Sequence, residues 1–253
     1  MFRLELSRWA VTALIVSSVA VPTCSAGGAA ITAHPQPAPS NIVVGFVGGF
    51  VRHNNPHHGP VQLAQRLQRN TASDTYVRVF ENRHRRTAYN TILQLLDADH
   101  NGVLSAEEKT RARIILFGHS WGASAVVMLA RELDRAGIPV LLTVQVDSVA
   151  KPWQDDSIVP DNVVSAVNFY QPHGLIHGRA EITAADVAKT QVLGNYRFDY
   201  MKAPVRCEAA SWFDHLTRNH AQSECDPHLW TQVEELVRER LSAPIATALP
   251  ARP

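Results

Sequence analysis

The chain has 253 residues, of which 45% are hydrophobic, enough for the core of one large α/β domain and short for two domains. Its formal net charge is +1. A net charge this small produces only a weak electrostatic field, which favours neither nucleic acid nor an anionic membrane surface as a partner. Composition leaves the oligomeric state open.

The first 26 residues have the pattern of a secretory signal peptide. Arg3 and Arg8 form a basic start, an apolar stretch runs from Trp9 to Val21, and small residues lead to Ala26. The apolar run of about 13 residues is too short to span a membrane comfortably. We therefore expect cleavage near Ala26, a secreted or periplasmic protein, and no transmembrane span in the mature chain. The alternative is an uncleaved membrane anchor.

The chain contains three cysteines. Cys24 falls inside the signal region and lacks the small residue normally found before a lipoprotein cysteine, so acylation is not expected there. Cys207 and Cys225 remain as an even pair in an exported protein, which predicts a disulfide. In the chain-entropy model, a bridge of this span stabilises the fold by about 3 kcal/mol. The alternative is a pair of buried free thiols.

Predicted strands and helices alternate after a Gly/Ala/Pro-rich leader at residues 27–40. Nearly all-apolar strands in such an alternation predict a parallel sheet covered by helices on both faces. Residues 171–210 show no clear period, and we expect an irregular segment over the sheet edge. Residues 243–253 are expected to form a disordered tail. The predicted strands are 41–50, 75–82, 111–118, 138–149 and 162–171, and the predicted helices are 59–70, 86–97, 122–137 and 226–241.

The stretch GHSWG, residues 118–122, fits the nucleophile-elbow pattern G-x-S-x-G with Ser120 as the nucleophile. This motif places a serine on a strained turn between a buried strand and a helix, so that its hydroxyl projects above the sheet. The segments on either side are such a strand and such a helix. Gly118 and Gly122 remove side chains that would collide across the turn. The alternative is an ordinary strand–helix turn with a chance serine.

The elbow, and the order nucleophile, acid, histidine, resemble the α/β-hydrolase superfamily over roughly residues 41–242. The resemblance implies a small α/β-hydrolase domain with about six mostly parallel strands and a catalytic histidine in a loop before the last helix. RNHAQSECDPHLW is similar to one version of that loop, with a histidine followed by Asp-Pro and a Trp-bearing helix. It selects His220 as the base. His228, behind Pro227, is expected on the surface, and His215 is a further alternative.

The acid is expected at a strand end, where α/β folds place their chemistry. Asp147 breaks an apolar strand at its carboxyl edge, one of the acid positions used by lipase-like members of the superfamily. The commoner position lies one strand later, but no carboxylate follows that strand until Glu181 and Asp186. We therefore predict Asp147. The alternatives are three loop carboxylates, Asp155, Asp156 and Asp161.

The oxyanion hole should combine the backbone N–H of Trp121 with a second N–H from the loop after the first strand. VGFVGGF places glycines in that loop, which predicts Gly49 or Phe50 as the second donor. The loop lacks the histidine-glycine signature of many lipases, so the resemblance leaves this donor undetermined. The next residues include three histidines without regular ligand spacing, so we expect a polar rim around the pocket rather than a metal site. These are His53, His57 and His58.

Residues 97–108, DADHNGVLSAEE, match the calcium-loop pattern D-x-[DN]-x-[DN]-G-x₅-E. Gly102 makes the turn, and oxygen ligands suited to Ca²⁺ stand at the required positions. The predicted ligands are Asp97, Asp99, Asn101, the Val103 carbonyl, Ser105 or its water, and Glu108. The alternative is a surface turn in which Ser105 and Glu108 form a capping box.

The flanks of this loop differ from those of EF-hand proteins. The outgoing helix is short, and no second loop pairs with the first. We therefore expect a structural Ca²⁺ that pins the connection into the strand before Ser120 without touching the reacting atoms.

Together these patterns predict an exported serine hydrolase, lipase- or esterase-like, that cleaves small-molecule or lipid acyl esters or thioesters. Lipase, esterase and thioesterase activity are not separated by these residues. Two other classes remain: a non-catalytic calcium-binding protein on a hydrolase scaffold, and an envelope-anchored binding protein.

Overall fold

The computed structural model describes residues 38–207 and 214–243. The predicted signal peptide, residues 27–37 of the predicted leader and residues 244–253 of the predicted tail lie outside the described residues. The elements of the domain run from Asn41 to Ser242.

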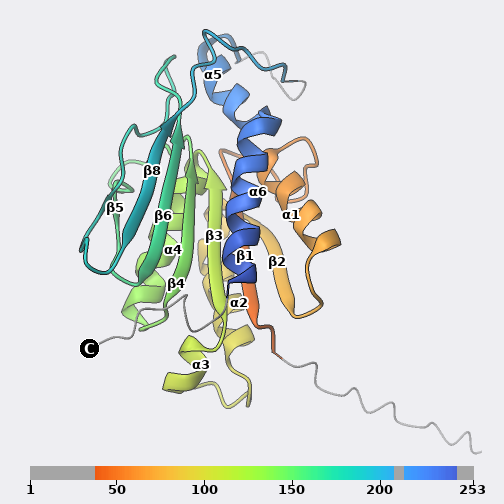
Figure 1. Cartoon of the computed structure of the whole chain (residues 1–253), viewed down its shortest axis with the longest axis vertical. Coiled ribbons are helices and arrows are strands. Elements are labelled where there is room, and N and C mark those ends of the chain that lie inside the picture. Colours follow the sequence, from red (N-terminus) through yellow and green to blue (C-terminus); the bar gives the residue numbers. More distant parts are fainter. Residues whose placement is uncertain (1–37, 208–213, 244–253) are drawn as a thin grey trace, which may run out of the picture. The chain divides into compact units, whose positions relative to one another are not determined.

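Six strands form one sheet in the order β2-β1-β3-β4-β6-β8 (Figure 1). Every neighbouring pair is parallel, so the carboxyl ends of the strands share one edge. The chain passes from β1 to β2 on one side and then to β3 on the other, which makes this edge a switch point in the topology. The expected sheet of about six strands is confirmed. The strands are β1 (Asn41–Val47), β2 (Thr75–Glu81), β3 (Arg113–His119), β4 (Val140–Val146), β6 (Val163–Tyr170) and β8 (Gln191–Arg197).

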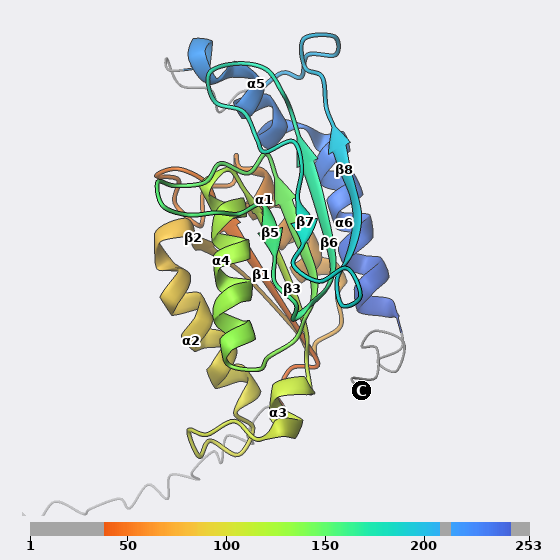
Figure 2. The same cartoon turned by 90° about the vertical axis from the view of Figure 1, so that its left-hand side faces the viewer.

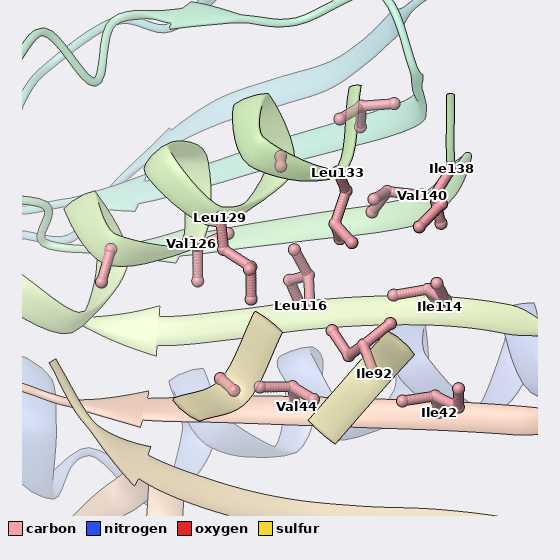
Figure 3. Close-up of a cluster of buried hydrophobic side chains, with 14 of the residues drawn as sticks. Ile42, Val44, Ile92, Ile114, Leu116, Val126, Leu129, Leu133, Ile138 and Val140 are labelled. Atoms are coloured by element: carbon pink, nitrogen blue, oxygen red, sulfur yellow. The ribbon is translucent and has the colours of Figure 1, made fainter. Parts of the chain in front are cut away.

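Helices cover both faces of the sheet, as predicted (Figure 2). Along β1, Val43 and Val47 face one hydrophobic cluster while Ile42, Val44 and Phe46 face the other, the period of two expected for a strand buried on both sides. Figure 3 shows the second cluster, in which the strands pack against α2 and α4. The first cluster contains residues of α1 and α6. These helices are α1 (Gly59–Asn70), α2 (Arg85–Leu96), α4 (Trp121–Arg135) and α6 (Pro227–Ser242).

Two segments differ from the prediction, and the first is residues 171–210. This segment contains β8, which pairs with β6 at the edge of the sheet. Its sequence, QVLGNYR, carries a glycine and polar side chains and is mostly half-buried or exposed, so it lacks the apolar run of the inner strands. The segment also supplies β7 (Thr183–Ala184), which pairs with β5 (Ile158–Val159) in a separate two-stranded sheet.

The second difference is α5 (Asp214–Cys225). The segment before the last helix is itself a helix rather than the expected loop, so His220 lies on a helix. Over residues 217–225, the part of α5 whose side chains the structure describes, the buried side chains are those of Asn219, Gln222 and Ser223, all polar. Gln222 accepts a hydrogen bond from the Val205 backbone N–H at 2.6 Å. Because α5 packs through polar contacts, its sequence lacks the apolar stripe from which a helix is usually predicted.

Two short helical elements complete the fold, the 3₁₀ helix η1 (Asn82–His84) and the one-turn helix α3 (Ala106–Thr110). The predicted disulfide between Cys207 and Cys225 is present, with the two Cα atoms 5.4 Å apart. Within the described part of the chain, no helix is both long and apolar enough to cross a membrane.

Candidate active site

Ser120 lies where β3 passes into α4, in the strained conformation that the elbow motif requires. Its backbone has φ 59° and ψ −128°, a region that non-glycine residues rarely occupy. A Cβ atom on Gly118 would lie 2.5 Å from the Gly122 carbonyl oxygen, and one on Gly122 would lie 2.4 Å from the Phe46 carbonyl oxygen. The turn therefore needs glycine at both positions, as the motif predicts.

The structure brings Ser120, His220 and Asp147 into one hydrogen-bonded series. Nε2 of His220 lies 2.8 Å from the Ser120 hydroxyl oxygen, and Nδ1 lies 2.6 Å from Oδ2 of Asp147. The carboxylate accepts, so it favours a proton on Nδ1 and leaves Nε2 free to accept the hydroxyl proton of Ser120. The three residues come from the ends of β3 and β4 and from α5, which meet at the carboxyl edge of the sheet.

Asp147 is fully buried, and four donors besides His220 satisfy its carboxylate, the longest contact being that of the Ser223 hydroxyl at 3.4 Å from Oδ2. Oδ1 accepts the backbone N–H groups of Gly178 at 2.6 Å and Gln171 at 3.1 Å. Oδ2 accepts the Gln171 side-chain amide at 3.0 Å. A Cβ atom on Gly178 would lie 2.2 Å from Oδ1, so glycine is needed there. The sequence did not identify Gln171 or Gly178, although Gln171 directly follows β6, the strand after which the acid is more commonly placed.

The alternative acids are engaged elsewhere. Asp156 is buried against Ser148 and Arg179. Asp155 accepts hydrogen bonds from Ser157, and Asp161 pairs with Lys189.

The alternative bases do not replace His220 either. His228 is exposed and contacts Gln232 on its own helix. The side chain of His215 lies outside the described residues.

The predicted oxyanion loop is a tight turn beside Ser120. The Val51 N–H donates to the Gly48 carbonyl at 3.2 Å, with Gly49 and Phe50 at the centre of the turn. Gly49 has φ +47°. A Cβ atom on Gly48 would lie 2.7 Å from Cβ of Ser120, so the missing side chain lets the turn approach the serine. On the other side, Trp121 is the first residue of α4, where a backbone N–H has no acceptor within the helix.

Asn82 holds this turn, a role that sequence reasoning missed. Its side-chain amide donates to the Gly49 carbonyl at 2.6 Å and to the Val47 carbonyl at 3.3 Å. Lys151 in turn donates to Oδ1 of Asn82 at 2.6 Å. A buried amide that binds the carbonyls of two residues separated by one other fixes the direction of the peptide groups between them. The only sequence signal is a polar residue directly after β2.

A cavity of about 430 Å³ opens beside Ser120, between the loop after β1 and helix α5. This size is within the range of small-molecule sites. Its wall includes Val51, His58, His119, Trp121, Ile176 and Glu224. Of the three histidines predicted to rim the pocket, His58 therefore lines it. His53 lies 3.6 Å from Glu81, and His57 is exposed.

The predicted calcium loop connects α2 to α3. Oxygen atoms of Asp97, Asp99 and Glu108 lie within 4.8 Å of one another. Asp97 accepts the backbone N–H groups of Asn101 and Gly102, and Gly102 has φ +80°. Hydrogen bonds from the backbone N–H groups of the loop to Asp97 therefore fold the loop around this carboxylate.

The predicted capping box is also present, with hydrogen bonds in both directions between Ser105 and Glu108. The backbone N–H groups of Ser105 and Ala98 hold the pKa of Glu108 down to about 2. The charged carboxylate therefore persists over the whole physiological range. Ligand atoms of the predicted types stand together, so this donor set fits Ca²⁺.

No family model and no curated protein match the chain. Solved structures similar to it include an acetylxylan esterase (TM-score 0.40, 9% identity, 81% of this chain and 100% of that chain). A cutinase-like protein from Cryptococcus sp. has a TM-score of 0.40 and 13% identity, covering 82% of this chain and 98% of its own. Human thioesterase 2 has a TM-score of 0.40 and 8% identity, covering 79% and 95%. Structural similarity at these TM-scores and sequence identities does not determine the activity of this chain. The sheet order and the serine elbow of the chain itself define a small α/β-hydrolase fold.

Proposed function

We propose that this chain is an exported serine hydrolase that cleaves carboxylic esters or thioesters with Ser120, His220 and Asp147. The observation that carries the proposal is the hydrogen-bonded series from Ser120 through His220 to Asp147, built on a strained serine turn. Labelling of the intact protein with a fluorophosphonate probe tests it, since such probes react with an activated serine. Export is supported by the signal-peptide pattern and the disulfide, and the intact mass of the mature protein tests cleavage near Ala26.

The chemistry follows from the positions of the atoms. Ser120 Oγ forms a bond to the acyl carbon while His220 Nε2 takes its proton and Asp147 stabilises the resulting imidazolium. Backbone N–H groups of Trp121 and of Gly49 or Phe50 hold the oxyanion. His220 then gives the proton to the leaving alcohol or thiol. Water, deprotonated by His220, hydrolyses the acyl-enzyme and restores Ser120.

Asn82→Ala is expected to lower kcat on p-nitrophenyl acetate by about tenfold to a hundredfold with little change in KM. Loss of its two bonds to carbonyls frees the turn at Gly49, and small misplacement of oxyanion donors acts on the transition state more than on the bound substrate. Steady-state kinetics measure the effect.

The matched control is Asn162→Ala. Asn162 is another buried asparagine, whose amide donates to the Ala130 and Ile138 carbonyls away from the site. This variant should lose stability but keep kcat. If both variants lower kcat equally, Asn82 acts only through stability.

We also propose that the loop at residues 97–108 binds a structural Ca²⁺. The convergence of Asp97, Asp99 and Glu108 supports it. In Figure 1, α3 lies at the end of the sheet opposite α5, and β3, about 20 Å long, separates the loop from Ser120. An ion bound there would stabilise the entry to β3 without touching substrate.

Calcium is therefore expected to raise the melting temperature without being required for turnover. At about tenfold excess over Kd, binding to the folded state contributes about 1.4 kcal/mol, or roughly 3 to 6 °C. With a Kd of roughly 0.1 to 1 mM, the shift should appear at millimolar Ca²⁺. Asp97→Ala combined with Glu108→Ala should remove the calcium-dependent shift, measured by thermal unfolding.

Glu107→Ala is the control, because Glu107 is an exposed neighbour outside the ligand pattern, and it should keep the shift. An unchanged melting curve in several millimolar Ca²⁺ would leave only a capped turn. Immediate loss of activity on chelation at low temperature would instead place the ion in the active site.

A further inference from the structure

His119 is a buried polar side chain beside the proposed catalytic residues that has no part in the hydrolysis described above. It ends β3 and directly precedes Ser120, yet it is only 2% exposed. Alternate residues of a strand face the same side of a sheet. His119 therefore shares the side of Ile115 and Phe117, whose cluster contains residues of α1 and α6. Burial of an imidazole costs free energy unless its polar atoms find partners.

The ring of His119 lies against the ring of His220. The two ring centroids are 4.7 Å apart and the ring planes differ by 29°, which is a stacked arrangement. The edges of the His220 ring are held by Ser120 at Nε2 and by Asp147 at Nδ1. Both of these hydrogen bonds act along the edges of the ring. The contact with His119 acts on its face, so it restricts tilting of the ring.

Three residues of α5 surround His119 from one side of the helix. His220, Ser223 and Glu224 have the spacing i, i+3, i+4, which places them on one helical face. Ser223 Oγ lies 3.0 Å from Nε2 of His119 and donates to the His220 backbone carbonyl at 2.7 Å. Oε1 of Glu224 lies 3.6 Å from Nδ1 of His119 and is paired with His58 at 2.6 Å. This polar face of α5 therefore packs around the His119 ring.

The surroundings of His119 keep its ring neutral. Burial lowers the pKa of His119 to about 4, although the carboxylates of Glu224 and Asp147 act in the opposite direction. Repulsion by the imidazoles of His220 and His58 adds to the lowering. The face of a neutral aromatic ring attracts a cation, whereas a charged ring would repel it. His119 can therefore stay in contact with His220 when that ring takes the serine proton.

We propose that His119 is a positioning residue for the base His220. The inference rests on the proposed hydrolysis and adds a contact that acts on the reacting atoms only through His220. The flat ring of His119 holds the His220 imidazole in line between Ser120 and Asp147. Because α5 packs around the same ring, His119 also places the base above the end of β3, where the nucleophile stands. The elbow pattern G-x-S-x-G leaves the position of His119 open.

Three substitutions separate the stacked ring from the hydrogen bond to Ser223. His119→Ala removes both contacts, His119→Gln keeps an amide for Ser223 without a ring, and His119→Phe keeps a flat ring without the hydrogen bond. On p-nitrophenyl acetate, the alanine and glutamine variants should lower kcat by about tenfold to a hundredfold and change KM by less than about twofold, because a tilted base affects the transition state more than the bound substrate. The phenylalanine variant should stay within about fivefold of the wild-type kcat, since its ring still holds His220 in place.

A spectroscopic readout distinguishes positioning from loss of stability. The proton in the 2.6 Å hydrogen bond between His220 Nδ1 and Asp147 should give a low-field proton NMR signal in the folded protein. This signal should persist in His119→Phe and broaden beyond detection in His119→Ala. Asn162→Ala is the control, because it loses two buried hydrogen bonds away from the site. It should keep both kcat and the signal.

Thermal unfolding shows which variants are folded. A wild-type kcat in folded His119→Ala protein would overturn the role of His119. So would equal losses in His119→Phe and His119→Ala, or retention of kcat by His119→Gln, which would assign the effect to the hydrogen bond with Ser223. If His119→Phe does not fold, comparison of the other two variants with Asn162→Ala decides the question. Absence of both fluorophosphonate labelling and hydrolysis in the wild-type protein would refute the proposed hydrolase function itself, whereas the preceding outcomes leave that function intact.

Discussion

Ser120→Ala is expected to abolish hydrolysis of p-nitrophenyl esters and labelling by fluorophosphonate probes. The alanine lacks the hydroxyl that lies 2.8 Å from His220, so no acyl-enzyme forms. Loss of a nucleophile that acts as a unit with its base lowers kcat by roughly four to six orders of magnitude. Steady-state kinetics on purified protein, with the same substrate for both forms, measure this fall.

The fold should survive the substitution, because a methyl group fits wherever the serine side chain fits. Ser124→Ala is the matched control. Ser124 is a fully buried serine one turn along α4, and its hydroxyl contacts Gln154 rather than His220. Ser124→Ala should keep its labelling and most of its activity. Hydrolysis at near wild-type rate by pure Ser120→Ala protein would refute the assignment of the nucleophile.

His220→Ala is expected to lower kcat by several orders of magnitude, because His220 is the base hydrogen-bonded to the Ser120 hydroxyl. His228→Ala should change kcat by less than about twofold, since an exposed side chain outside the site contributes little. The two histidines lie on consecutive helices of the same segment, which makes them a matched pair. Ester turnover and the rate of fluorophosphonate labelling both measure the difference.

The structure gives the reason for the contrast. The ring of His220 stands between Ser120 and Asp147, whereas that of His228 contacts Gln232 and lies 6.5 Å from the Phe198 ring. If His228→Ala were the inactive variant, the positioning of α5 would be wrong. If both variants retained activity, the base would come from outside this segment.

Much of the architecture follows from local sequence. The inner strands are continuous apolar runs and the covering helices have clear apolar faces, so their period identifies them without tertiary information. The elbow is equally local, because the glycines at 118 and 122 are required by contacts within a few residues of the turn and with the neighbouring strand. Ser120 and Asp147 were predicted from such local patterns, whereas His220 was selected by the resemblance of its segment to the α/β-hydrolase superfamily.

The segments that depend on distant partners were not predictable. The strand β8 is recognised only by its pairing with β6 at the exposed edge. The helix α5 is held by buried polar groups and by the disulfide to Cys207. Neither has an apolar period of its own, so local pattern carried no signal for them.

The same reason applies to the groups that support the site. Asn82 reaches the Gly49 carbonyl, and Gln171 and Gly178 reach Asp147, across 24 to 33 residues of chain. Glu224 meets His58 across an even longer stretch. A hydrogen bond or ion pair between residues far apart in the chain leaves no periodic mark on either segment. The identity of the residues could be read from the sequence, but their partners were decided only when the sheet brought its strand ends together.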